Sequence, residues 1–137
     1  MIQKKQILIL CTGNSCRSIM AEAIINAKMN NYIEAQSSGV KASGKVNPQV
    51  KELLISKGEW RENYHSKVIE KVLDTSFDLI ITVCDNAKES CPLFPKAVKV
   101  IHVGFQDPTG KEKSAYSKTY DLIEKELLPI IEEYFTK

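Results

Sequence analysis

The sequence predicts an α/β protein, a three-layer sandwich with helices on both faces of a four-stranded parallel sheet. Strand-like and helix-like segments alternate from one end of the chain to the other, which is typical of such folds. The two clearest strand candidates, Ile7–Leu10 and Phe77–Val83, are nearly continuous apolar runs, as expected for strands buried on both faces. The 137 residues contain no internal repeat, linker or low-complexity segment, so we expect one domain over residues 1–137.

The first half of the chain contains two predicted strands and two predicted helices. An apolar run marks a buried strand over Gln6–Leu10, and a helix-like stretch follows over Ser18–Asn30. A short strand is expected over Ile33–Gln36. The next helix is expected over Asn47–Lys57, because asparagine is a favoured cap and proline suits the first helical position.

The second half adds two strands and a long helix. Phe77–Val83 is apolar and β-branched and forms the second clear buried strand, and Lys96–Val103 is a further strand candidate. Tyr116–Phe135 closes the chain as an amphipathic helix, with a bend expected at Pro129, where a backbone donor is missing.

The composition excludes several classes of protein. The chain is 43% hydrophobic and 26% charged, the balance of a globular domain, and a net charge of +2 is too small to indicate a nucleic-acid or membrane surface. No apolar run approaches the roughly 20 residues of a membrane helix, and the N-terminus leads into a strand without a separate secretory segment. We therefore expect a cytoplasmic protein that binds neither nucleic acid nor membrane. A monomer is also expected, although none of these patterns reports the oligomeric state.

The stretch CTGNSCRS places a cysteine where a strand ends and an arginine where a helix begins. The loop between Cys11 and Arg17 can turn its N–H groups inward, and with the helix dipole these donors form a cradle for a tetrahedral oxyanion. Gly13 permits a positive φ and Asn14 tolerates one, while the arginine fork can hold two oxygens. The predicted oxyanion-binding residues are Thr12, Gly13, Asn14, Ser15, Cys16 and Arg17.

Cys11 is the candidate nucleophile at the floor of this pocket. The positive field of the loop is expected to lower its pKa below the free value of about 8.5, and a hydroxyl from Ser18 or Ser15 would stabilise the thiolate. The alternative is a buried cysteine beside an unrelated helix cap. Cys16 is expected to pack without a redox role.

Four cysteines in a reducing compartment favour catalytic or redox use over persistent disulfides. A structural zinc site is the competing interpretation, but six residues separate Cys84 from Cys91, and His65 and His102 do not cluster, so we expect no metal site.

A helical segment would hold Cys84 and Cys91 about 10.5 Å apart along its axis, beyond the roughly 7 Å that a disulfide allows between Cα atoms. We therefore expect the segment from Cys84 to about Pro92 to be helical when reduced and to loop out when oxidised. The alternative is two buried cysteines that never meet.

Three segments that follow predicted strands should meet at one edge of the sheet, because ligands of α/β sheets bind beyond the carboxyl ends of the strands. They follow Leu10, Val83 and Val103. In the last of them, GFQDPTG, Asp107 is the candidate general acid, and the alternative is an ordinary Asp-Pro turn. The residue before it is Gln106, so a single carboxylate stands at this edge.

These features resemble the low-molecular-weight protein tyrosine phosphatase family and, more closely, the thioredoxin-coupled arsenate reductases built on that fold. The C-x5-R motif followed by serine indicates the superfamily, and Cys84 with Cys91 indicates the reductase branch. The resemblance covers nearly the whole chain and implies a low-molecular-weight phosphotyrosine phosphatase-like fold. Its other matching segments are Met20-Ala21-Glu22, Ser37-Ser38-Gly39, Val46-Asn47-Pro48, Cys91-Pro92 and Gly104-Phe105-Gln106-Asp107-Pro108.

The resemblance also implies a relay of three cysteines. In the similar reductases a loop cysteine attacks arsenate, a second attacks the first sulfur and releases arsenite, and a third carries the disulfide to where thioredoxin reduces it. By motif these are Cys11, Cys84 and Cys91 in that order. The remaining catalytic residues are Arg17, Asp107 and Ser18. Arsenate and thioredoxin are the expected partners, and no tightly bound cofactor is expected.

One departure from the family pattern concerns a cation. Some of the similar enzymes bind potassium through residues that match Asn14, Glu22 and Ser37, with an acidic side chain near position 67. This chain has Lys67 instead. We expect its ammonium to occupy the place of the ion and to pair with Glu22; the alternative is a solvated lysine.

The leading functional hypothesis is the reduction of arsenate to arsenite with electrons from thioredoxin, as in arsenic detoxification. The alternatives are a phosphatase acting on phosphotyrosine or small phosphate esters, and a non-enzymatic thiol redox sensor. Phosphate and arsenate are near-isosteric, but arsenic accepts two electrons from thiols and phosphorus does not. A phosphatase needs Cys11, Arg17 and Asp107 but has no use for Cys84 and Cys91. Weak phosphatase activity is expected, because the loop and the acid remain.

Overall fold

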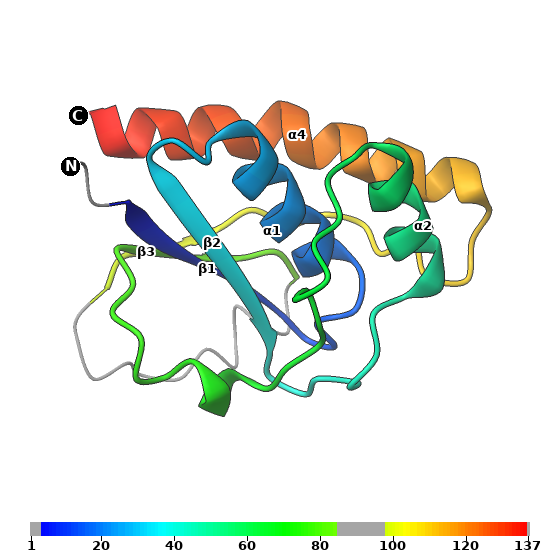
Figure 1. Cartoon of the computed structure of the whole chain (residues 1–137), viewed down its shortest axis with the longest axis horizontal. Coiled ribbons are helices and arrows are strands. Elements are labelled where there is room, and N and C mark those ends of the chain that lie inside the picture. Colours follow the sequence, from blue (N-terminus) through cyan, green and yellow to red (C-terminus); the bar gives the residue numbers. More distant parts are fainter. Residues whose placement is uncertain (1–3, 85–97, 137) are drawn as a thin grey trace.

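The computed structural model describes residues 4–84 and 98–136. Its core is a four-stranded parallel sheet with the strand order β2-β1-β3-β4 (Figure 1). The strands are β1 (Lys5–Cys11), β2 (Ile33–Gly39), β3 (Leu79–Thr82) and β4 (Val100–His102). The predicted α/β class and parallel sheet are confirmed.

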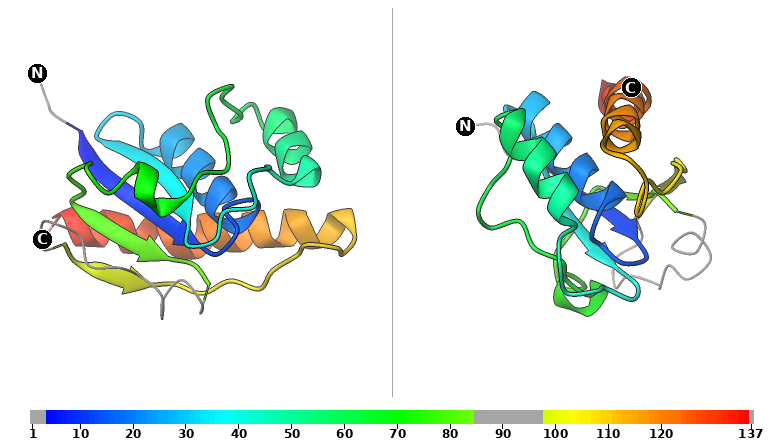
Figure 2. Two further views of the ribbon diagram at one scale, coloured as in Figure 1. Left: turned by 90° about the horizontal axis from the view of Figure 1, so that it is seen from below. Right: turned by 90° about the vertical axis from the view of Figure 1, so that its right-hand side faces the viewer.

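The helices of the described residues pack mainly on one face of the sheet. They are α1 (Arg17–Lys28), α2 (Pro48–Ser56) and α4 (Lys113–Thr136), and α2 packs against both α1 and α4. The opposite face carries irregular chain with one 3-10 turn, η1 (Ile69–Lys71), which lies in front of the sheet in the left view of Figure 2 while α1 and α4 lie behind it. The sheet is therefore covered on both sides, as the apolar strands predict.

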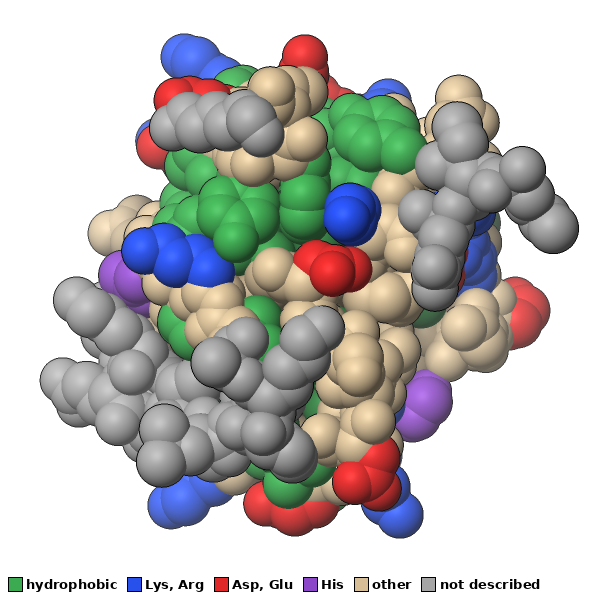
Figure 3. All heavy atoms as spheres, turned by 90° about the vertical axis from the view of Figure 1, so that its left-hand side faces the viewer, with side chains coloured by type: hydrophobic (Ala, Val, Ile, Leu, Met, Phe, Trp, Pro, Cys, Tyr) green, Lys and Arg blue, Asp and Glu red, His purple; other side chains and the backbone are tan. Residues whose placement is uncertain are grey.

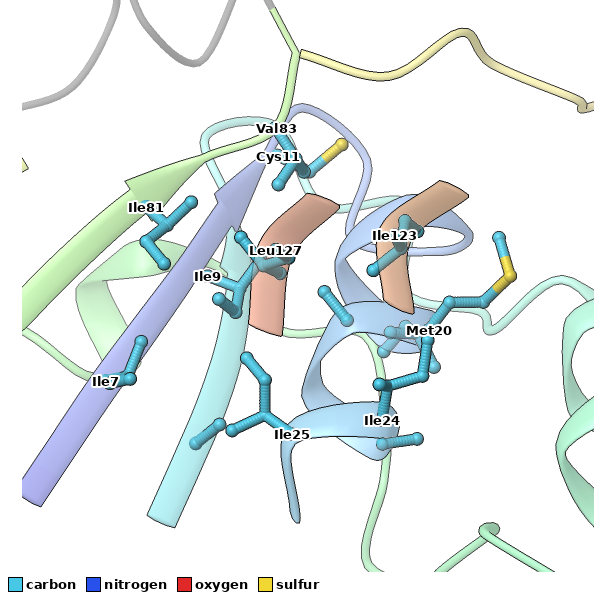
Figure 4. Close-up of a cluster of buried hydrophobic side chains, with 14 of the residues drawn as sticks. Ile7, Ile9, Cys11, Met20, Ile24, Ile25, Ile81, Val83, Ile123 and Leu127 are labelled. Atoms are coloured by element: carbon cyan, nitrogen blue, oxygen red, sulfur yellow. The ribbon is translucent and has the colours of Figure 1, made fainter. Parts of the chain in front are cut away.

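The core lies between β1 and β3 on one side and α1 and α4 on the other. Figure 4 shows Ile9 of β1 and Ile81 of β3 beside Leu127 of α4, and all three side chains are fully buried. Leu8 and Leu10, which point to the other face, are also fully buried. Both faces of β1 thus contribute to the free energy of folding.

The strand register sets which residues meet at the carboxyl edge. Cys11 pairs with Gly39 on β2, and Leu10 pairs with Thr82 on β3. The residues just beyond these pairs, including Cys84, therefore converge at one edge of the sheet. Figure 3 shows the opposite side of the molecule, at the amino ends of the strands, where hydrophobic side chains gather among charged ones.

The observed elements differ from the expected ones mainly at their ends. β2 runs to Gly39 rather than to Gln36, because pairing with β1 continues through polar residues that have little strand preference of their own. α4 begins at Lys113 and continues through Pro129 without ending there. Of the helices in residues 4–84 and 98–136, none combines the length and the apolar character needed to cross a membrane.

Candidate active site

The loop that joins β1 to α1, residues 11–17, is called the oxyanion loop below. Its carbonyl groups are tied to the chain that follows β2, so they point away from the interior of the loop. Each carbonyl is anti to the next N–H in its peptide unit, so the amides of the loop face inward. The four bonds, of 2.8–3.0 Å, run from the amides of Val40, Lys41, Ser43 and Asn47 to the carbonyls of Cys11, Thr12, Gly13 and Ser15.

Asn14 supplies the left-handed backbone conformation of the loop, with a φ of 50°, whereas Gly13 has no positive φ. The asparagine side chain is fully buried and fully used. Its Nδ2 donates to Ser18 Oγ and to Ser37 Oγ, both at 2.8 Å, and its Oδ1 accepts from the amide of Lys67 at 2.8 Å. These bonds stabilise the strained residue from three sides.

The thiols of Cys11 and Cys84 lie next to each other at the floor of the loop. Both side chains are buried, and the two sulfurs are within hydrogen-bonding reach of each other. The hydroxyl of Thr12 lies 3.0 Å from the sulfur of Cys84 and forms a hydrogen bond with it. Cys11, Cys16 and Cys84 are in the thiol form and not in disulfides. Cys91 and the predicted switch segment beyond Cys84 lie outside the described residues.

The predicted low pKa of Cys11 is wrong for this reduced state. The hydrogen bond with Cys84 and burial raise the pKa of the Cys11 thiol, and the charge of Arg17 and the amide of Thr12 lower it by less. Burial, followed by the charge of Asp107, raises the pKa of Cys16 to about 12, so this thiol stays protonated near neutral pH. Sequence reasoning brought the segments after Leu10 and Val83 to one edge of the sheet, but it considered only the positive field of the loop and not the effect of Cys84 on the pKa of Cys11.

Replacing Cys84 with alanine is therefore expected to lower the pKa of Cys11. The variant loses both the hydrogen bond and the like charge that disfavour the Cys11 thiolate. The pH dependence of iodoacetamide alkylation, followed on the Cys11 peptide by mass spectrometry, measures this shift. An unchanged or higher midpoint in the variant would contradict the electrostatic account.

Arg17, the first residue of α1, is held by the segment after β4. Its Nη1 donates to the carbonyl of Phe105 at 3.0 Å, and its Nη2 lies 3.6 Å from Asp107 Oδ2. Its Nε is buried without a partner among the described residues, which fits a donor reserved for a bound anion.

Asp107 lies at the same edge, as its position in the sequence predicts. Burial raises the pKa of its carboxyl, but the Thr109 hydroxyl and amide, followed by the charge of Arg17, outweigh it and lower the pKa overall. The carboxylate is therefore ionised near neutral pH and lies beside the Arg17 guanidinium. The general-acid role stays a prediction.

Glu22 is a buried carboxylate that bonds to Ser37 and is influenced by the charge of Lys67. Its carboxylate accepts a 2.6 Å hydrogen bond from Ser37. Burial raises the pKa of Glu22 to about 7, while the charge of Lys67 and the Ser37 bond lower it in part. The side-chain oxygens of Asn14 and Ser37 are both hydrogen-bonded to protein groups.

The two histidines lie apart and have local partners. His102 Nδ1 is 2.8 Å from Thr82 Oγ1, and His65 Nδ1 is 2.8 Å from the carbonyl of Asn63. Within residues 4–84 and 98–136, no three His, Cys, Asp or Glu side chains are grouped so that they could hold a metal ion.

Gly39 is a site residue that sequence reasoning placed only within the family resemblance. A Cβ atom at this position would lie 2.4 Å from the carbonyl oxygen of Thr12 and 3.1 Å from Asn14. The glycine therefore lets β2 approach the oxyanion loop closely. A glycine at the end of a strand next to serines was the available signal, but only the strand register identifies its neighbour.

Comparison with known proteins places the chain in a family. The model of the low molecular weight phosphotyrosine protein phosphatase family matches residues 6–134. Arsenate reductase 2 of Staphylococcus haemolyticus is 37% identical over 136 residues, which are 99% of this chain and 100% of the relative. Arsenate reductase of Brevibacillus brevis is 40% identical over 123 residues, 90% of this chain and 91% of the relative.

Solved structures agree with this placement. The arsenate reductase of Archaeoglobus fulgidus is 31% identical, with a TM-score of 0.77 over 91% of this chain and 98% of that one. The low molecular weight protein tyrosine phosphatase of T. tengcongensis is 28% identical, with a TM-score of 0.82 over 95% and 99% of the two chains. The chain belongs to the low molecular weight phosphotyrosine protein phosphatase family.

Proposed function

We propose that this protein reduces arsenate to arsenite and takes the electrons from its own cysteine thiols. Relatives named arsenate reductases that match the chain over almost its entire length support this function. The observation that carries the proposal is the contact between the thiols of Cys11 and Cys84 at the oxyanion loop. A hydrolytic phosphatase has no use for a second thiol at that point.

In the first step the sulfur of Cys11 attacks arsenic, a sulfur–arsenic bond forms and an arsenic–oxygen bond breaks. The departing hydroxyl takes up the proton of the Cys11 thiol and leaves as water. The loop amides and Arg17 hold the remaining oxygens. Arsenic is still pentavalent after this step.

In the second step the sulfur of Cys84 attacks the sulfur of Cys11. A disulfide forms, the electron pair of the sulfur–arsenic bond stays on arsenic, and trivalent arsenite leaves with the proton of the Cys84 thiol. The Thr12 hydroxyl, 3.0 Å from Cys84 Sγ, is placed to stabilise the attacking thiolate. The two thiols have then supplied the two electrons.

The final steps rest on the family resemblance. Cys91 attacks the sulfur of Cys84 and frees Cys11, and thioredoxin reduces the resulting Cys84–Cys91 disulfide. A reaction that needs free thiols at rest suits the cytoplasm, where thiols are kept reduced. Cys91 lies outside the described residues, and the Cys91→Ser variant described next tests its part in the relay.

The test is arsenate-dependent NADPH oxidation with thioredoxin and thioredoxin reductase. The protein is expected to sustain turnover, and Cys91→Ser is expected to stop after about one equivalent of arsenite per chain, with a Cys11–Cys84 disulfide. Turnover of p-nitrophenyl phosphate alone would favour the phosphatase, and reversible oxidation without arsenate turnover would favour the redox sensor.

Phosphatase activity is a second candidate, because Cys11, Arg17 and Asp107 meet at one edge as they would for ester hydrolysis. An ester needs a proton for its departing oxygen, and Asp107 is the donor in that chemistry. The lowered pKa of Asp107 leaves little of the protonated form near neutral pH. We therefore propose weak phosphatase activity that is greatest under acidic conditions.

We further propose that Lys67 replaces a potassium ion, since its charge already stabilises the ionised Glu22. The pKa of Glu22 in the folded protein, about 7, lies above the ordinary value of 4.5. As the pH rises between these values, the unfolded chain releases the Glu22 proton before the folded protein does, so the stability of the fold decreases. Lys67→Met should therefore lower the Tm more at pH 8, where Glu22 is ionised, than at pH 5. A Tm of the wild type that rises in potassium chloride but not in sodium chloride would refute the replacement.

A further inference from the structure

We propose that Tyr116 is a positioning residue of the active site, whose hydroxyl joins the oxyanion loop to the segment that carries Asp107. Residues 107–110 are called the Asp107 loop. The proposal extends the proposed function and rests on it for the arsenate readout only. Nothing in the resemblance or in the relay requires this tyrosine.

The tyrosine hydroxyl accepts two hydrogen bonds in the core. Tyr116 lies in the first turn of α4 and its side chain is only 4% exposed. Its oxygen accepts from the amide of Gly110 at 3.3 Å and from Nδ2 of Asn47 at 3.1 Å. Both lone pairs of one buried oxygen are thus used to join two segments that are distant in the sequence.

Asn47 connects this hydroxyl to the oxyanion loop. Its backbone amide donates to the carbonyl of Ser15 at 2.8 Å, and its Oδ1 accepts from the amide of Gln49 at 2.8 Å, which caps α2. One residue therefore fixes a loop carbonyl, the start of α2 and the tyrosine hydroxyl. The loop cannot move far from Tyr116 without breaking one of these bonds.

Gly110 connects the hydroxyl to Arg17 through the Asp107 loop. The loop is a tight turn, closed by a 2.9 Å bond from the Lys111 amide to the Pro108 carbonyl, with a φ of +82° at Gly110. This positive φ permits the turn that presents the glycine amide to Tyr116. At the other end of the turn, the Thr109 amide donates to Asp107 at 3.0 Å, and Asp107 Oδ2 lies 3.6 Å from Arg17 Nη2.

Loss of the Tyr116 hydroxyl would therefore weaken oxyanion binding at the active site. Without it, the Gly110 amide and the Asn47 side chain lose their acceptor, and one restraint on the Asp107 loop is gone. Asp107 is half exposed and depends on this loop to stay near the guanidinium. A less restrained Asp107 holds Arg17 less well, so the protein binds oxyanions more weakly before any chemistry occurs.

The test compares Tyr116→Phe with Tyr120→Phe. Tyr120 is equally buried, lies one turn further along α4, and donates its hydroxyl to Glu59 rather than to the active site. Oxyanion binding is read from the concentration of inorganic phosphate that half-protects Cys11 from iodoacetamide, followed on the Cys11 peptide. We expect this concentration to rise about tenfold in Tyr116→Phe and to change less than about twofold in Tyr120→Phe.

A double-mutant cycle tests the route through Asp107. In the Asp107→Asn background, Tyr116→Phe is expected to change the protecting concentration less than about twofold, because the contact it supports is already weakened. Asn47→Ser can still cap α2 and loses the amide donor to Tyr116, but it keeps the bond from the Gly110 amide to the hydroxyl. It should therefore change the protecting concentration less than about twofold. For arsenate, KM should rise in Tyr116→Phe while kcat changes little.

Equal protecting concentrations in Tyr116→Phe and Tyr120→Phe would overturn the proposal, and so would a full tenfold effect in the Asp107→Asn background. A wild-type protein that does not turn over arsenate would refute the proposed function instead. Phosphate protection would still decide the role of Tyr116.

Discussion

Cys84→Ala is expected to lower steady-state arsenate reduction by about a thousandfold or more, because it removes the second nucleophile of the proposed relay. The same variant should hydrolyse p-nitrophenyl phosphate at least as fast as the wild type, since that reaction needs only the first nucleophile. Its Cys11 thiolate should also form more readily once the hydrogen bond with Cys84 is gone. The coupled thioredoxin assay and the ester assay on one preparation measure both effects.

A substitution of the neighbouring residue Val83 distinguishes lost packing from the lost thiol in Cys84→Ala. Val83 precedes Cys84 at the same strand end and is fully buried. Val83→Ala removes more apolar volume than Cys84→Ala, so it should cost more stability, about 0.5–2 kcal/mol, yet keep arsenate turnover near the wild-type level. Wild-type arsenate turnover in Cys84→Ala, or an equal loss in Val83→Ala, would leave the second thiol without a chemical role.

The fold was predictable from local patterns to a large extent. The apolar runs before Cys11 and before Cys84 predict β1 and β3, and the Asn-Pro pair predicts the start of α2 within one residue. The end of β2 was not predictable, because Ser37–Gly39 has no strand preference and becomes a strand by pairing with β1. Contacts distant in the sequence decide such positions.

The site divides in the same way. Cys11, Arg17 and the loop between them are contiguous, so the sequence could indicate an oxyanion cradle. The strand pattern also brings the segments that follow Leu10 and Val83 to one edge, but the raised pKa of Cys11 depends on the hydrogen bond with Cys84, which no pattern in the sequence indicates. The close approach of Gly39 to Thr12 likewise follows from the register in which β2 pairs with β1, with Gly39 opposite Cys11.

Gly39→Ala is the second substitution with a large expected effect. The added Cβ would meet the carbonyl oxygen of Thr12 at 2.4 Å, and backbone atoms at the floor of the oxyanion loop cannot move aside as a flexible side chain could. Either β2 or the loop must shift. A shift of the loop by about 1 Å is enough to lower kcat/KM about a hundredfold, and we expect this loss for arsenate and for p-nitrophenyl phosphate alike.

A glycine away from the site distinguishes loop displacement from lost stability. Gly58 has a φ of +71° and open space where a Cβ would lie. Gly58→Ala should therefore lower the free energy of unfolding by about 1–2 kcal/mol through backbone strain, without any clash. Both variants should show a lower Tm, but only Gly39→Ala should lose both activities and the protection of Cys11 by phosphate. Full activity in Gly39→Ala would mean that the loop tolerates displacement, and the close approach of β2 would then serve packing rather than oxyanion binding.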